Sequence, residues 1–470
     1  MVITVKKFLV FVLVFILALC PVYVMSSVAA GDFVVEDGVL LSFTGLTTTV
    51  TIPDDVYYIA DGAFKENVRI NKLNLHDGVT AVGNEAFYGC TSLKEVNGGE
   101  SVDYVGAYAF YGTPYFDNAA SELATLGSVV LGGTTASALE IPENITMIAP
   151  YAFAENTVIE SLITYDSLSV IGEGAFYRCN NLSTVNVSSN LSYIGSLAFS
   201  GTKFVADSED EFVVLGDGCL VGYKGSDSSV TVPDSVKHIT GGAFYSNTHI
   251  TEVNVPDGVA SIGERAFMNC TKLAEVSLPE SLIMIDKEAF ARCKALKTIT
   301  VPASVQLMGE SVFFGCNSLE NAKLLCDLDI PRGIFANCTS LAYATISQKT
   351  TEIGDSAFLN CTSLTDLSVS DTVKTIAPSA FQGAEKLTVS CNKASFAFEF
   401  CSENGINVQQ CGDANLDGKV NIRDATYIQK HVASIVTMNE LEALRAEVNF
   451  DGKINVRDAT YIQKLLAGLI

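Results

Sequence analysis

The 470-residue sequence has no tryptophan, only four histidines and few basic side chains, with 29 Lys and Arg against 53 Asp and Glu. Its formal net charge of -24 argues against a nucleic-acid partner, because a phosphate backbone would be repelled rather than neutralised. The lack of tryptophan removes the side chain that sugar-binding platforms usually offer, although the 17 tyrosines could serve instead. These shortages favour a role other than binding nucleic acid.

The familiar catalytic motifs are also missing from the sequence. It contains no Gly-x-Ser-x-Gly, no His-Glu-x-x-His and no phosphate-cradling glycine loop. A glycosidase pair of carboxylates is not excluded by counting acidic residues. The histidines are interpreted as ordinary surface residues, and they are His76, His238, His249 and His431. The sequence therefore favours a protein that is not an enzyme.

A long hydrophobic run is missing as well. The longest one, from Phe8 to Leu19, is too short for a stable membrane span, which needs about 20 apolar residues. Lysines precede it and the small residues of 28–30 follow it, so residues 1–30 are predicted to be a signal peptide. Cys20 hints at a lipoprotein box, which is the less favoured alternative. We expect an extracellular protein with no membrane span.

What the sequence does contain is a phenylalanine that recurs along most of the chain. Ten of the twelve intervals between successive copies are 22 or 23 residues, and the other two are 43 and 45. The copies are Phe64, Phe87, Phe110, Phe153, Phe176, Phe199, Phe244, Phe267, Phe290, Phe313, Phe335, Phe358 and Phe381. A period of this length predicts a solenoid, in which each unit buries its apolar side against its neighbours.

One unit, Leu273–Leu296, shows how the chain is expected to fold. Alternation over 273–278 places Val276 and Leu278 on the inner side of a strand and Glu275 and Ser277 on the outer side. The outward positions of this strand are polar and partly acidic, which suits a protein or basic ligand at least as well as a glycan. They include Glu95, Asn97, Thr184, Asn186, Glu252, Asn254, Glu275, Ser277, Asp366 and Ser368.

The two long intervals divide the array into three blocks. The segment 212–225 echoes 33–45, and 123–133 is a degenerate copy of the same pattern. The blocks open near residues 33, 116 and 212 and hold three, three and seven phenylalanine markers. The inserted segments carry turn-forming Asp-Gly and Lys-Gly pairs, so we predict intercalated β-hairpins that continue the solenoid.

These repeats resemble the leucine-rich repeats of the BspA-type bacterial surface proteins, with their AFxxC and LxxVxLP elements. The resemblance covers roughly residues 33–390 and recurs thirteen times. It implies a repeat solenoid with parallel strands lining one face. We assign 31–390 to this solenoid of 13 repeats in three blocks and 391–411 to a linker.

Most of the 13 cysteines fall in one column, three residues after the phenylalanine marker. Asn and Thr occupy the same column at the ends of the blocks, and all three residue types can satisfy turn backbone groups. We predict a buried ladder of thiols, because successive copies are about 23 residues apart and no Cys-x-x-Cys pair suggests a metal. Cys391, Cys401 and Cys411 lie past the array and could pair, while Cys219 and Cys326 remain unassigned.

The last sixty residues change in composition and contain two copies of a calcium-loop pattern. Asp413, Asn415, Asp417, Lys419 and Asp424 occupy the first, third, fifth, seventh and twelfth positions of the first copy. Oxygen side chains and one backbone carbonyl at these positions can surround a hard cation, and a glycine supplies the sharp turn. The second copy starts 34 residues later, and its candidate ligands are Glu447, Asn449, Asp451, Lys453 and Asp458.

This tandem pair resembles the type I dockerin, a small all-α module that binds cohesin domains on scaffold proteins of plant-fibre-degrading bacteria. The resemblance covers residues 412–470 and implies two calcium ions, with Asn421 and Asn455 acting near them. It places recognition residues at matching positions of the two helices. They are Ile422, Arg423, Gln429 and Lys430, then Val456, Arg457, Gln463 and Lys464.

Two functional hypotheses follow from the sequence. The favoured one is a secreted, non-catalytic recognition or adhesion subunit, whose repeats bind a protein or surface ligand and whose dockerin binds a cohesin. The alternative is a subunit that acts directly in polysaccharide degradation, through a sugar-binding or glycosidase face on the solenoid. The loops could also hold calcium only in order to fold the module, without any partner.

Overall fold

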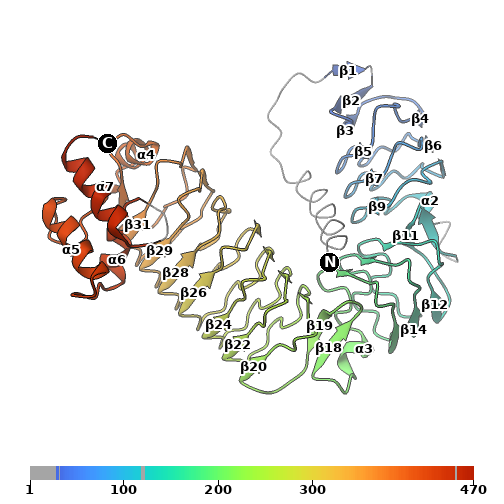
Figure 1. Ribbon diagram of the computed structural model, residues 1–470. Helices are drawn as coiled ribbons and strands as arrows, with labels where there is room; N and C mark the ends of the chain where they lie inside the picture. Colours follow the sequence, from blue (N-terminus) through green and yellow to red (C-terminus); the bar gives the residue numbers. More distant parts are fainter. Residues whose placement is uncertain (1–27, 31, 118–121, 450–452, 470) are drawn as a thin grey trace. The chain divides into compact units, whose positions relative to one another are not determined.

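The computed structural model describes residues 28–30, 32–117, 122–449 and 453–469 (Figure 1). Contacts within the chain define two compact units, residues 1–209 with 215–217, and residues 210–214 with 218–470. Each unit is described by itself below. No helix within the described ranges is long and apolar enough to cross a membrane. Most of the predicted signal peptide, including Cys20, lies outside the described residues.

The predicted strand of the repeat is present, and each coil adds a second, shorter one. In the unit quoted above, β24 (Glu275–Ser277) ends just before Pro279, whose missing amide hydrogen cannot continue a ladder. The chain turns there, since the Leu282 amide donates to the Pro279 carbonyl, and forms β25 (Met284–Ile285). Stacking such coils gives a β-solenoid of about 16 turns over residues 39–410, with two parallel ladders.

Unit 1 contains the first two blocks, and each block contains two ladders of strands. The first block pairs β1 (Val28–Ala30), β2 (Phe33–Glu36), β3 (Val39–Phe43), β5 (Tyr58–Ile59), β7 (Ala81–Val82) and β9 (Tyr104–Val105), and beside them β4 (Thr49–Thr51), β6 (Lys72–Asn74) and β8 (Glu95–Asn97). The second block pairs β10 (Ala124–Leu126), β11 (Val129–Gly132), β13 (Met147–Ile148), β15 (Val170–Ile171) and β17 (Tyr193–Ile194), and beside them β12 (Ala138–Glu140), β14 (Ser161–Ile163) and β16 (Thr184–Asn186).

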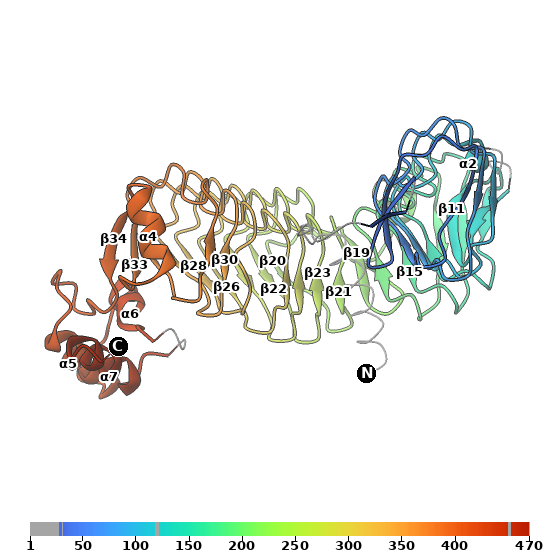
Figure 2. The ribbon, with the colours of Figure 1, turned by 90° about the horizontal axis from the view of Figure 1, so that it is seen from above.

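The third block, in unit 2, continues the same arrangement (Figure 2). One ladder contains β18 (Phe212–Leu215), β19 (Cys219–Tyr223), β21 (His238–Ile239), β23 (Ser261–Ile262), β25 and β27 (Leu307–Met308), and β30 (Glu352–Ile353) pairs with β32 (Thr375–Ile376). The other contains β20 (Ser229–Thr231), β22 (Glu252–Asn254) and β24, then β26 (Thr298–Val301), β28 (Asn321–Leu324), β29 (Tyr343–Thr345), β31 (Asp366–Ser368), β33 (Thr388–Cys391) and β34 (Asn407–Gln410). The register is exact, with Val253 opposite Val276.

The predicted hairpins open the blocks. β2 and β3 pair antiparallel, as do β10 and β11, and β18 lies beside β19 in its sheet. The second strand of each hairpin then pairs in parallel with the first strand of the following coil, so that β3 joins β5, β11 joins β13 and β19 joins β21. The hairpins therefore start the solenoid ladders, as the sequence predicts.

The phenylalanine markers form the centre of the core. Phe64, Phe87 and Phe110 stack with ring centroids 4.8 and 5.1 Å apart, and every marker of the third block stacks on or tilts against the next. The markers are at most 6% exposed. A ring that lies between two other markers thus buries both faces against the coils before and after it, which a single repeat could not do.

The thiol ladder is confirmed, and its chemistry is specific. Each thiol of the column donates to the carbonyl of the phenylalanine marker one coil earlier, at 3.0–3.2 Å, and each residue is 0% exposed. The seven members are Cys90, Cys179, Cys270, Cys293, Cys316, Cys338 and Cys361. Burial raises the pKa of these thiols, to about 11 for Cys90 and about 12 for Cys270. They are therefore protonated, structural groups.

Asn and Thr end the column for a physical reason. At the start of a block, Asn67 accepts hydrogen bonds from the Arg69 and Ile70 amides through its side-chain oxygen. At the end of a block no further coil supplies a thiol, and Thr113 donates to the carbonyl of its own marker, Phe110, at 2.7 Å. Thr113 also accepts the amide of residue 116 in the short helix α2 (Pro114–Asp117), and Thr202 caps α3 (Lys203–Ala206) in the same way.

The segment 391–411, which the sequence assigns to a linker, is folded. Helix α4 (Phe396–Glu403) begins at Ser395, whose side chain accepts the Phe398 amide, and β34 pairs in parallel with β33. Ala397 and Cys401, spaced four residues apart on α4, are fully buried in the solenoid core. The last coil would otherwise expose its apolar end, so this segment covers it. Cys391, Cys401 and Cys411 are all buried free thiols.

Candidate functional site

The first candidate calcium loop ends in an amphipathic helix that its own residues cap. Helix α5 (Ile422–Val432) begins after Asn421, whose side chain accepts the Arg423 amide, while Asp424 accepts the Asn421 amide at 2.8 Å. This reciprocal cap satisfies the first free amides of the helix. Gly418 has a φ of +81°, a conformation that glycine adopts without strain, and it turns the loop back on itself.

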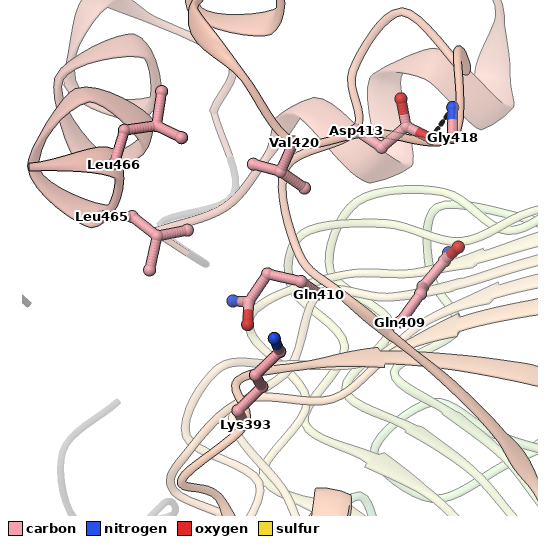
Figure 3. A pocket seen from close by; sticks show the side chains of 8 residues that line it. All are labelled: Lys393, Gln409, Gln410, Asp413, Gly418, Val420, Leu465 and Leu466. Carbon is pink, nitrogen blue, oxygen red and sulfur yellow. Dashed lines mark hydrogen bonds between the residues drawn. The ribbon is translucent and has the colours of Figure 1, made fainter. Parts of the chain in front are cut away.

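The two end residues of this loop turn their carboxylates inward. Asp413 accepts the Asp417 amide at 3.0 Å. It also accepts the Gly418 amide at 2.9 Å (Figure 3). Asp424 accepts the Asn415 amide at 3.2 Å, so it ties the beginning of the loop to the helix. Asp413 is 5% exposed and Asp424 is fully buried. Two buried carboxylates thus frame a loop that is otherwise exposed.

The electrostatics of the loop fit a bound cation. Burial raises the pKa of Asp424, and the charges of Asp413 and Asp417 raise it further, against the lowering effect of the backbone amides. Asp424 has no ion-pair partner in the part of the chain that the structure describes. A divalent cation would reverse this repulsion. Across the described ranges no three His, Cys, Asp or Glu side chains form a metal cluster, so the Asn415 amide and the Lys419 carbonyl would have to complete the ligand set.

The second loop repeats this hydrogen-bond pattern. Asp458 accepts the amides of Asn449 and Asn455 at 3.4 and 2.9 Å, as Asp424 accepts those of Asn415 and Asn421 in the first loop. Asp458 is fully buried and lies in helix α7 (Val456–Leu466), which Asn455 caps. Two independent copies of one loop geometry indicate one shared function. The predicted ligand Asp451 lies outside the described residues.

Asn421 and Asn455, predicted to act near the ions, each perform two structural tasks. Besides capping their helices, they donate from Nδ2 to the carbonyls of Lys419 and Lys453, at 3.1 and 2.9 Å. These carbonyls stand at the loop position where a backbone oxygen is the expected cation ligand. The two asparagines therefore orient the carbonyls, and their contact with an ion stays a prediction.

The helical module has its own small core. Ala425 and Ile428 of α5 and Ala459 and Ile462 of α7 are buried, together with Met438 and with Ala446 of α6 (Glu440–Ala446). The eight predicted recognition residues point away from this core and are all exposed, with Ile422 at 56% and Val456 at 58%. Apolar side chains at the first position of two equivalent helices are thus open to solvent.

Arg445, in α6, joins the module to the repeats. Its Nη2 donates to Asp366 of β31 at 2.6 Å, and its Nη1 lies 3.5 Å from Asp413, the first residue of the first loop. The Arg445 side chain is 15% exposed. Asp366, predicted as an outward strand position, is buried because Arg445 covers it. Sequence reasoning missed this contact, since nothing in the pattern links residues 79 positions apart.

A second contact distinguishes the two halves of the module. The Tyr461 hydroxyl accepts the side-chain amide of Asn392, next to β33, at 3.0 Å. Its counterpart in the first half, Tyr427, instead donates to Glu442 of α6 at 3.0 Å. A cavity of about 440 Å³ lies beside these contacts and is lined by Lys393, Gln409, Gln410, Asp413, Gly418, Val420, Leu465 and Leu466 (Figure 3). The two halves therefore keep equivalent residues at this position but make different contacts, because only the second half meets the solenoid through its tyrosine.

The histidines make local structural contacts. His76 bonds to the Pro53 carbonyl and accepts the Gly78 amide, His238 bonds to Ser261 in the next coil, and His431 accepts the Met438 amide. These bonds fit their interpretation as ordinary surface residues of the repeats and the module.

Models of two known families match successive parts of the chain. The model of the BspA type leucine rich repeat region matches residues 41–121, 116–206, 221–338, 265–388 and 329–404 in six copies. The model of the dockerin type I domain matches residues 411–467. Neither domain is typically catalytic, and dockerin type I domains typically bind calcium and imply a cohesin partner. No curated protein matches the chain.

Solved structures with similar repeats come from several bacteria. A leucine rich cell surface protein from Faecalibacterium prausnitzii is 24% identical over 77% of this chain and 98% of its own, with a TM-score of 0.31. The leucine rich repeat protein of T. pallidum is 27% identical over 42% of this chain and 94% of its own, with a TM-score of 0.36. A pneumococcal vaccine antigen is 17% identical over 83% of this chain and 99% of its own, with a TM-score of 0.33. On the extent of the family match, the chain belongs to the BspA-type leucine-rich repeat family and ends in a dockerin type I domain.

Proposed function

We propose that this protein is a secreted, non-catalytic recognition subunit, which its dockerin attaches to a cohesin on a scaffold protein while its repeats bind a further ligand. The observation that carries the proposal is the duplicated loop-and-helix geometry. Both loops place a buried Asp on the helix and equivalent exposed residues on its surface. A module that bound calcium only to fold would not need matching exposed apolar residues such as Ile422 and Val456.

Calcium would bind through two sets of oxygen ligands. The first set is Asp413, Asn415, Asp417, Asp424 and the carbonyl of Lys419, and the second is Glu447, Asn449, Asp451, Asp458 and the carbonyl of Lys453. Each ion would neutralise carboxylates that burial brings together and so stabilise the small helical core. The residues of this chain contribute the framework, because the backbone amides already orient both end carboxylates.

The cohesin surface would comprise two equivalent patches. One contains Ile422, Arg423, Gln429 and Lys430 of α5, and the other contains Val456, Arg457, Gln463 and Lys464 of α7. Because the patches share sequence and exposure, a cohesin could bind either one after the module turns by half a revolution. Their basic side chains suit an acidic partner surface.

The repeats would bind a protein outside the cell. Several outward residues of the three-residue strands are exposed and polar, as at Thr184, Asn186, Glu252, Asn254 and Glu275. Such a face has few apolar groups for stacking on sugar rings, and its carboxylates match a basic protein surface. The dockerin and the similar cell-surface proteins point to an extracellular location.

Calorimetric titration of the full chain with a panel of bacterial cohesins tests this function. Binding to at least one cohesin in calcium, abolished by a chelator, is the expected result. Calcium binding without any cohesin binding across a broad panel would leave the module as a structural cap. Hydrolysis of a plant polysaccharide by the purified chain would refute the non-catalytic role and favour direct action in polysaccharide degradation.

A further inference from the structure

In two of the three blocks, the opening hairpin adds aromatic rings to the phenylalanine ladder. In the first block Phe43 packs on the first marker, Phe64, with ring centroids 5.2 Å apart, and Phe33 packs on Phe43 at 4.9 Å. In the third block Tyr223 packs on the first marker at 5.0 Å, and another hairpin ring packs on Tyr223 at the same distance. The free face of the first marker ring is thereby covered.

The second block lacks these rings. Aligning the three hairpins places Leu123 at the position of Phe33 and Gly133 at the position of Phe43. The first marker of this block is Phe153, which stacks on Phe176 on its other side. Gly133 has no side chain with which to cover the free side of Phe153. The ladder of this block therefore begins without the ring that starts the other two.

A cavity of about 600 Å³ lies at this position, within unit 1. Phe110, Phe116, Leu131, Gly133 and Phe153 contribute to its apolar wall. Its size falls within the usual range of about 300–1,000 Å³ for ligand-binding pockets. The cavity thus coincides with the missing ring and is large enough for a side chain from another molecule.

Tyrosines surround this cavity. Tyr108 stacks on Tyr151 with centroids 4.8 Å apart and meets Tyr111 edge-on at 5.9 Å, while Tyr111 also stacks on Tyr88 at 5.7 Å. Tyr108 is 41% exposed and Tyr111 is 54% exposed, although both rings are large. Such a cluster of exposed tyrosines beside a partly apolar cavity is typical of the binding sites in protein interfaces.

We propose that this cavity binds an aromatic side chain of the protein ligand of the repeats, a step that rests on the proposed binding role of the array. The chain itself shows which group fits, because Phe43 and Tyr223 fill the equivalent place in the other two blocks. A sugar fits less well, since Tyr108 and Tyr111 each already stack on a neighbouring ring, which leaves less ring face for a sugar to cover.

Ligand-observed NMR on the full chain with N-acetyl-tyrosine amide and N-acetyl-phenylalanine amide tests the proposal. We expect binding in the millimolar range, as for other very small ligands, and none for N-acetyl-serine amide. Tyr108→Ala and Tyr111→Ala should each weaken binding about fivefold, by removing a ring contact. Gly133→Phe should fill the cavity and abolish binding. Gly133 has a φ of +79°, which strains any other residue, so the Tyr108→Ala and Tyr111→Ala variants keep the test valid if Gly133→Phe misfolds.

Tyr245→Ala provides the matched control. Tyr245 directly follows its phenylalanine marker, as Tyr111 does, and is 48% exposed, but it belongs to the third block. Its replacement should leave binding unchanged. The proposal is overturned if the aromatic amides do not bind, if the two tyrosine variants bind as well as Tyr245→Ala, or if cellohexaose displaces the aromatic amides. Cohesin binding, proposed for the dockerin domain at residues 411–467, is measured separately, so failure of this pocket and failure of the proposed attachment are distinguishable.

Discussion

Arg445 lies between two carboxylates, and this position gives a signed prediction for calcium affinity. Its guanidinium is 2.6 Å from Asp366 in the solenoid and 3.5 Å from Asp413 in the first loop. The Arg445 guanidinium therefore pairs mainly with Asp366 and only weakly with Asp413, a proposed calcium ligand. Asp366→Asn removes that competitor, and we expect Arg445 to close on Asp413.

The magnitude follows from the distances. If the guanidinium moves from 3.5 Å to about 2.8 Å, an ordinary length for a charge-assisted bond, the attraction to Asp413 grows by about 1 kcal/mol at an effective dielectric constant of about 20. Calcium must overcome this extra attraction, so its affinity for the first loop should fall about fivefold to tenfold. Arg445→Gln removes the competing cation and should instead tighten calcium binding to this loop.

Calorimetric titration of the full chain with calcium measures both changes, and the second loop serves as an internal reference. Lys464→Gln is the control, because it removes one positive charge from an exposed residue of α7 that forms no ion pair with Asp413 in the described part of the chain. An unchanged or tighter calcium affinity in Asp366→Asn would refute the reasoning. So would weaker calcium binding in Arg445→Gln.

Three further predictions concern the ladder and the recognition surface. Cys293→Ala should lower the free energy of unfolding by about 1 kcal/mol, since the buried Phe267 carbonyl loses the thiol and keeps the Cys270 amide as its donor. Cys293→Ser should restore part of this loss, and urea unfolding checks both variants. The pKa of Cys270 is raised to about 12, so the protonated thiol stabilises the fold below pH 9, and this contribution is lost as the pH rises towards 12. The melting temperature should therefore fall between pH 9 and 12. At pH 8, iodoacetamide should label the thiols of the ladder only after the protein has unfolded. Arg423→Glu or Arg457→Glu alone should leave cohesin binding nearly intact, because the other patch remains, whereas the double variant should weaken it at least about tenfold in calorimetry.

Much of the fold could be read from periodicity. Residues one repeat apart become neighbours in adjacent coils, so the stacked phenylalanines and the thiol column follow directly from a spacing of about 23 residues. The two loops of the dockerin domain were equally visible, since the candidate calcium ligands of each loop lie within twelve consecutive residues. The structure then shows Asn421 and Asn455 as helix caps, a role that the pattern did not predict, and it buries Asp424 and Asp458 at the ends of the loops.

Features without a period were harder to predict. The second ladder of two-residue strands is too short for an alternation pattern, and α4 lacks the phenylalanine marker. The only signals for α4 were the helix-capping Ser395 and the spacing of Ala397 and Cys401. A terminal coil must be covered by something other than another repeat, so its sequence departs from the consensus.

The sequence by itself determined the repeat architecture, the column of thiols and the tandem loops of the dockerin domain, because each depends on residues at a fixed separation along the chain. Only the tertiary structure decided that Asp366 is buried under Arg445 and that a cavity lies beside Gly133. These features depend on which elements meet in space. A contact between residues 79 positions apart, or a ring missing from one of three hairpins, leaves no regular spacing for the sequence to reveal.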